Sequence, residues 1–158
     1  MVIVVGAALV VAAIFALIYY RIGFPSFSPE ENSLVRVAQA EKAAFEDYRH
    51  GTNTEGTQAL LSLAQLLQKE EVRWQNTSNG RVFATDLGLT YGRLALLAEA
   101  VGATEKRDQY FALARTWLAN NGSDLGSEQQ IRIFVALADE SGDRGEALDS
   151  NQRTNTTP

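Results

Sequence analysis

Acidic side chains and a single histidine are the residues of this chain whose types could support acid–base chemistry. Three pairs of acids are adjacent in sequence, namely Glu30–Glu31, Glu46–Asp47 and Glu70–Glu71. Neighbouring residues on a helix point about 100° apart, so none of these pairs can form a carboxylate dyad, and we expect solvated faces instead. His50 stands at a predicted helix end, where it complements the helix dipole, and the sequence positions no partner that would make it a catalytic base.

Other chemistries have still less support. The chain has no cysteine, which excludes disulfides, thiolate nucleophiles and cysteine zinc sites. Asp139, Glu140 and Asp143 could gather a cation, but their spacing is not that of a calcium loop. With a net charge of −5 and a sequence pI of about 4.9, the chain also lacks the basic stripe that nucleic-acid phosphates require. We therefore expect no enzymatic activity, no metal or cofactor site and no nucleic-acid binding.

The element that would place the chain in the cell is an uncharged apolar run over residues 2–20, VIVVGAALVVAAIFALIYY. At about 1.5 Å per residue, a helix of this length spans roughly 28 Å, close to the ~30 Å core of a bilayer. No basic residue precedes the run and no small-x-small cleavage pattern follows it, which favours an uncleaved single-pass anchor over residues 1–21. Arg21 favours a cytoplasmic position for the rest of the chain, and an extracytoplasmic position is the alternative.

The anchor carries a stripe of small residues, because Ala8, Ala12 and Ala16 recur every four positions. Such a face lets two transmembrane helices approach closely, so the stripe could form a homodimer or pack against another membrane protein. The alternative is that alanine is simply common in apolar helices.

The rest of the chain has helical periodicity, which predicts an all-α domain of about five helices over residues 30–148. A linker with two prolines, residues 22–29, precedes this domain, and a polar tail, residues 149–158, is expected to be disordered. The first helix should begin after Ser28, with Pro29 in its first position, and end at His50–Gly51. The other four are predicted over about residues 54–70, 81–101, 104–121 and 127–141.

Particular residues support these boundaries. Asn53 or Thr54 can cap the second helix, whose many leucines predict that it is central in the packing. On the third helix, one apolar face should form the core, and Gly102 suits the left-handed position that ends it. Ser127 and Gln130 form a capping box for the fifth helix. The predicted face of the third helix consists of Phe83, Leu87, Tyr91, Leu94, Ala98 and Val101.

Three short motifs resemble the tetratricopeptide-repeat family. Leu87-Gly88-x-x-Tyr91 is similar to the signature of the first helix of that repeat, and Tyr110-Phe111-x-x-Ala114 is similar to that of the second. Gly142-Asp143-x-x-Glu146-Ala147-Leu148 resembles the turn of that repeat into its second helix. The resemblance covers residues 80–148 and implies a degenerate stack of helical hairpins that binds protein partners.

In such a stack, the first helix of each pair lines a concave groove. The resemblance therefore implies that Asp86, Thr90 and Arg93, which form one stripe opposite the apolar face, contact a partner, and Trp74 at a helix end is a further candidate. An ordinary solvated face is the alternative for the stripe. The sequence predicts a membrane-anchored adaptor, and a structural accessory subunit of a larger membrane complex is the alternative function.

The orientation of the anchor can be tested with a reporter fused after Pro158. Because Arg21 favours the cytoplasmic side, we expect activity from a cytoplasmic reporter and none from a reporter that works only outside the cytoplasm. The opposite pattern would show that the domain is extracytoplasmic.

Overall fold

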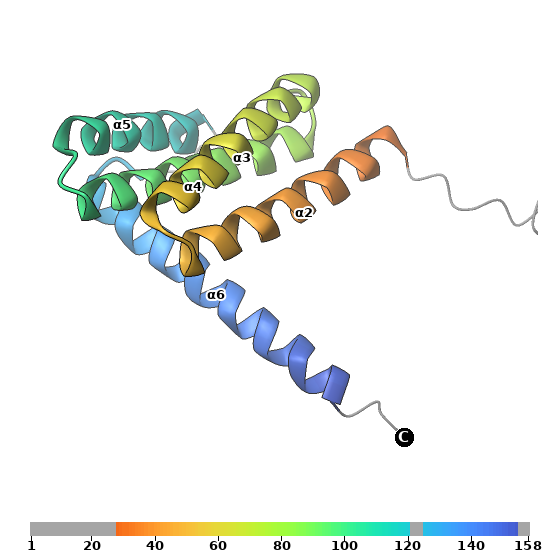
Figure 1. Ribbon diagram of the computed structural model, residues 1–158. Coiled ribbons are helices and arrows are strands. Elements are labelled where there is room, and N and C mark those ends of the chain that lie inside the picture. Colours follow the sequence, from red (N-terminus) through yellow and green to blue (C-terminus); the bar gives the residue numbers. More distant parts are fainter. Residues whose placement is uncertain (1–27, 121–124, 155–158) are drawn as a thin grey trace, which may run out of the picture. The chain divides into compact units, whose positions relative to one another are not determined.

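The computed structural model describes residues 28–120 and 125–154, which form helices and no strands. The elements are α2 (Pro29–His50), α3 (Asn53–Trp74), α4 (Ser78–Ala100), α5 (Thr104–Asn120) and α6 (Glu128–Thr154), as Figure 1 shows. The predicted all-α class is confirmed. The predicted anchor, its alanine stripe and nearly all of the linker lie outside the described residues. None of the helices in the described ranges combines the length and apolarity that a membrane crossing needs.

By its contacts the chain divides into two units, residues 1–35 and 36–158. The described part of the first unit is the beginning of α2, and it is capped as predicted. The Glu31 amide donates to the Ser28 hydroxyl over 3.1 Å, and the Ser28 amide donates back to the Glu31 carboxylate over 2.6 Å. These bonds from Ser28 lower the pKa of Glu31. The rest of this subsection concerns the second unit.

The start of α3 differs by one residue from the prediction. Thr52, rather than Asn53 or Thr54, is the N-cap, and its hydroxyl accepts from the Glu55 amide over 3.3 Å. The Glu55 carboxylate in turn accepts from the Thr52 amide over 2.8 Å. Only Thr52 has an acidic residue three positions later, so only Thr52 can complete the reciprocal capping box.

The central helix is α4, not the leucine-rich α3. It packs against α3, α5 and α6, whereas α3 packs chiefly against α4. Five of the six residues predicted for its core face are buried, and Val101 is the exception, with 59% of its surface exposed. Val101 follows the last helical residue, Ala100, so it has left the helical phase. Gly102 has a φ of 73°, which confirms the predicted left-handed end.

Two glycines allow the close packing around α4. A Cβ atom at Gly88 would lie 2.5 Å from the Cγ atom of Leu118 on α5, and one at Gly92 would lie 2.7 Å from Val135 on α6. Both neighbouring side chains are buried, so they have little room to move. The glycine of the Leu87-Gly88-x-x-Tyr91 motif is therefore the point where α5 packs onto α4. The motif tyrosines also meet, since Tyr91 stacks on Tyr110 with ring centroids 6.3 Å apart.

Several helix ends lie beyond their predicted positions. α4 begins at Ser78, because Thr77 caps it before the predicted start at about residue 81. α6 begins with the predicted capping box, in which the Gln130 amide donates to the Ser127 hydroxyl over 3.2 Å. It does not end at Ser141–Gly142 but continues to Thr154. A glycine costs a helix only about 1 kcal/mol, and no proline lies between residues 128 and 157. Residues 149–154, expected in a disordered tail, thus belong to α6.

Glu70 corrects another expectation, because it does not lie on a solvated face. Its side chain is 0% exposed and forms an ion pair with Arg36 on α2. The Trp74 indole also donates to the Glu70 carboxylate over 3.2 Å. Glu70 is in phase with Leu63 and Leu67 on the buried side of α3, and its partners compensate the desolvation of its charge.

The Gly88 contact gives a test of the packing. We expect Gly88→Ala to lower the free energy of unfolding by about 1–3 kcal/mol, because the new methyl group overlaps a buried leucine. Chemical denaturation of the full-length chain in detergent would measure the loss. Gly126→Ala is the control, since nothing lies within 4 Å of a Cβ there. In a Leu118→Ala background the cost of Gly88→Ala should largely disappear, and an unchanged cost would contradict the packing.

Candidate functional site

Four side chains from three helices form a cluster around Phe45 of α2, called here the Phe45 cluster: Phe45, Arg49, Arg93 and Asp139. The guanidinium carbons of Arg49 and Arg93 lie 4.2 and 4.7 Å from the centroid of the Phe45 ring. Arg93 donates to the Asp139 carboxylate through two nitrogens, over 2.9 and 2.8 Å. Arg49 donates to the backbone carbonyl of Asp139 over 2.9 Å. The cluster therefore connects α2, α4 and α6 through cation–π contacts and charged hydrogen bonds.

Beside the Phe45 cluster is a cavity of about 390 Å³ with side chains from α2, α3, α4 and α6 in its wall. Glu41 of α2 and Asp86 of α4 both line it, and they are called here the acid pair. Arg93 lines the same cavity, but its donors already bind Asp139. Leu60 and Leu63 of α3 make part of the wall apolar. The acid pair thus lies in a partly desolvated space, where Arg93 is bound to Asp139 and the other lining cation, Lys42, is exposed to solvent.

Burial and mutual repulsion shift the titration of the acid pair. Desolvation, followed by the nearby charge of Glu41, raises the pKa of Asp86 to about 7, and Arg93 only partly offsets this. Desolvation also raises the pKa of Glu41, again against the effect of Arg93. Both shifts have the sign expected for carboxyl groups that lose water and share a site. The pair can therefore retain a proton at pH values where exposed carboxyl groups are ionised.

The structure brings together only part of the stripe predicted on α4. Asp86 and Arg93 lie close to each other, but they face α2 and α6 inside the cavity wall. Thr90 is 1% exposed, and its hydroxyl donates to the Asp86 carbonyl over 2.7 Å, so it is buried rather than on an open face. Trp74 is half-buried and belongs to the separate contact with Glu70. Asp86 and Arg93 are half-buried in the cavity wall, and the contact of the stripe with a partner stays a prediction.

Two residues of this region, Glu41 and Asp139, were not among the predicted partner contacts. Glu41 lies four positions after Val37 and three before Ala44, two buried residues of α2. Asp139 follows the buried Val135 by four positions on α6. An acid in phase with a buried apolar stripe was thus the signal that could have identified both.

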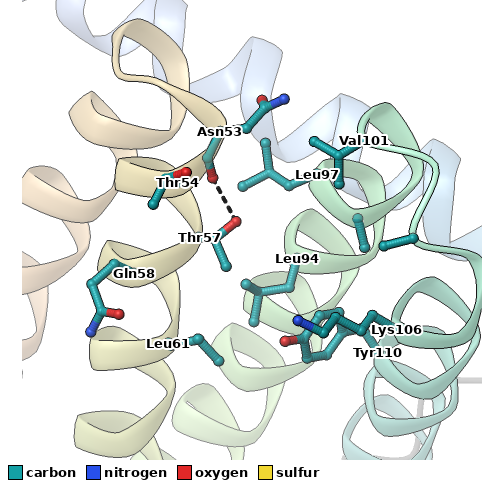
Figure 2. A pocket seen from close by; sticks show the side chains of 12 residues that line it. Asn53, Thr54, Thr57, Gln58, Leu61, Leu94, Leu97, Val101, Lys106 and Tyr110 are labelled. Atoms are coloured by element: carbon teal, nitrogen blue, oxygen red, sulfur yellow. Dashed lines mark hydrogen bonds between the residues drawn. The ribbon is translucent and has the colours of Figure 1, made fainter.

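A second concave surface, called here the α3–α5 groove, lies between the first half of α3, the end of α4 and the start of α5. Its volume is about 280 Å³ (Figure 2). Leu61, Leu94, Leu97 and Val101 make its apolar part. Asn53, Thr54 and Gln58 bring hydrogen-bonding groups along α3, and Lys106 is its one charged lining residue among those the structure describes.

The remaining candidates for chemistry lie elsewhere. His50 is exposed at the end of α2, with its Nε2 atom 3.9 Å from the Glu46 carboxylate. Within residues 28–120 and 125–154, no three histidine or acidic side chains are grouped so that they could hold a metal ion. Asp139, considered above as a cation ligand, is bound by Arg93 instead. The described residues therefore offer a half-buried pair of acids with raised pKa values and an open groove.

Comparisons with protein families, with curated proteins and with solved structures find no match to this chain.

The Phe45 cluster predicts a measurable stabilisation. The Arg93 and Asp139 side chains are only 13% and 22% exposed, so removing one charge leaves the other poorly solvated. We expect Asp139→Asn to lower the free energy of unfolding by about 1–3 kcal/mol at pH 7. Glu46→Gln, which removes an exposed acid on α2, should cost less than about 0.5 kcal/mol. Equal effects of the two substitutions in denaturant titrations would contradict the role assigned to Asp139.

Proposed function

We propose that this protein is a membrane-anchored helical adaptor whose α3–α5 groove binds a segment of a partner protein. The observation that carries the proposal is the make-up of the groove, which has apolar side chains along its centre and hydrogen-bonding groups on one side. Peptide-binding grooves combine these features, because apolar anchors supply affinity and polar groups fix the orientation of the bound chain.

The charge of the groove suggests the chemistry of the partner. Among the described lining residues Lys106 is the one charged group, and no carboxylate accompanies it. Lys106 is exposed and lies one helical turn before Tyr110 on α5, at the edge of the groove in Figure 2. A partner segment with an aliphatic side chain followed by a carboxylate would match the apolar centre and this cation. The rest of this acidic chain would repel such a segment, so the groove is the favoured place for it.

Two further features support the adaptor proposal. The hairpin of α4 and α5 is joined at Gly88 and through the contact of Tyr91 with Tyr110, as a tetratricopeptide-like pair of helices would be. The apolar run over residues 2–20 would hold such a domain at a bilayer. We place the partner in the α3–α5 groove rather than on Asp86 and Arg93, since Arg93 is bound to Asp139 of α6 and Asp86 lies in the cavity wall with Glu41 of α2.

A charge reversal at the edge of the groove tests the proposal. We expect Lys106→Glu to reduce the recovery of the partner in co-purification with the full-length protein at least fivefold, because it replaces the one cation with a repelling acid. Arg115→Glu is the matched control, since Arg115 is an exposed cation on the same helix that does not line the groove. The partner would be identified by mass spectrometry after crosslinking through a photoreactive residue at Gln58.

Two results would contradict the groove. One is equal loss of the partner from the two charge-reversed variants. The other is that the partner is lost only from a chain in which both Asp86 and Arg93 are replaced. That result would show that the partner binds the predicted stripe on α4 instead. A large stoichiometric complex on native sizing, unchanged by any of these substitutions, would favour the accessory-subunit alternative.

A further inference from the structure

The acid pair lies at an interface between helices rather than on a surface. Glu41 belongs to α2 and Asp86 to α4, and both line the cavity of about 390 Å³. Within the described ranges, neither carboxylate has an ion-pair partner within 4 Å or a hydrogen bond to its side chain. Two ionised carboxylates in such a space repel each other, and their repulsion acts directly between the two helices.

The charged groups that face the pair do not cancel this repulsion. α4 contributes Arg93, which is bound to Asp139 of α6, so the two largely neutralise each other. α2 contributes Lys42 on the cavity wall, together with Arg49, which is held over the Phe45 ring, and the neutral Tyr48. From α3 the wall receives only Leu60 and Leu63 among the described residues. Lys42 is exposed to solvent and Arg93 is paired with Asp139, so these cations only partly offset the repulsion between two ionised acids.

We propose that the acid pair is a proton-operated switch that docks residues 36–50 of α2 onto α4 when it holds a proton and releases them when both acids are ionised. The proposal is independent of the α3–α5 groove, because it concerns the packing of α2 against α4. In chain order α2 directly follows the predicted anchor and linker. The switch would therefore control how firmly the domain is connected to its membrane tether.

The direction of the pH dependence follows from the shifted titration. In the docked state the pKa of Asp86 is raised from its ordinary 3.8 to about 7, so docking takes up a proton. Docking is then strongest in acid and weakens as the pH rises between the ordinary pKa of Asp86 and its raised pKa in the docked state. Above the raised pKa, docking no longer depends on pH. Between pH 5 and pH 8 the docking equilibrium should fall on the order of a hundredfold, since each unit of difference in pKa corresponds to a tenfold change.

The absence of native cysteine allows a direct measurement. Ala44 on α2 is buried, so the thiol of an Ala44→Cys variant reacts with a disulfide reagent such as 4,4′-dithiodipyridine only when α2 is released. The labelling rate of Ala44→Cys is measured in the full-length chain in detergent micelles. It is divided by the labelling rate of Ser62→Cys, whose thiol is exposed, because this ratio corrects for the effect of pH on thiol reactivity. We expect this ratio to rise on the order of a hundredfold from pH 5 to pH 8.

Substitutions that remove one charge of the pair should diminish the rise. In the Ala44→Cys background, Asp86→Asn should keep the ratio at pH 8 near its value at pH 5. Glu41→Gln should give a smaller rise than the parent chain, because it removes the repulsion but leaves the desolvation of Asp86. Glu46→Gln, which alters an exposed acid on the same helix, should leave the rise intact. Ala114→Cys on α5, also fully buried, should stay protected at both pH values because release is confined to α2.

Three outcomes would overturn the proposal. They are a flat ratio in the parent chain, a rise in both charge-removing variants as large as in the parent chain, and a parallel rise at Ala114→Cys, which would show global unfolding. If one of the two variants fails to fold by circular dichroism, the other still decides the question.

Discussion

The burial of α4 is the constraint on which the rest of this structure depends. This helix has neighbours on several sides, so its side chains must either fit closely or find polar partners inside the domain. Gly88 and Gly92 provide the close fit, since they let α5 and α6 approach the backbone. Thr90 donates to its own helix, and Arg93 binds Asp139. Asp86 is the residue of α4 whose loss of solvation is least compensated by polar partners. Its raised pKa, and with it the behaviour of the acid pair, follows from this.

Local sequence signals predicted much of the fold, because helix starts depend on a few neighbouring residues. The capping serines at positions 28 and 127 and the left-handed Gly102 were all read correctly. A helix start was predicted wrongly where neighbouring residues could also act as the N-cap, as at Thr52. A helix end was predicted wrongly where a glycine was expected to terminate the helix, as at Gly142. The choice of α3 as the central helix failed for a different reason. Leucine content reports how much surface a helix can bury, not how many neighbours it has.

The candidate sites were harder to predict, because polar residues have no single preferred environment. Glu41, Glu70 and Asp139 each lie in phase with a buried apolar stripe, yet a carboxylate in such a position is ordinarily expected at the surface. Arg36, which pairs with Glu70, and Arg93, which pairs with Asp139, come from other helices, and pairing between distant helices leaves no periodic trace in the sequence. The α3–α5 groove likewise depends on how three helices diverge, which composition does not encode.

The order of the helix contacts has a consequence for how the domain is made. α4 packs most extensively with its neighbours in sequence, α3 and α5, and such local topology favours rapid folding. The hairpins can therefore form one after another as the chain leaves the ribosome. The bond from Arg49 to Asp139 instead joins residues 90 positions apart, so it must wait until α6 has been synthesised. During synthesis α2 thus remains without its full set of contacts until the last helix of the domain has formed.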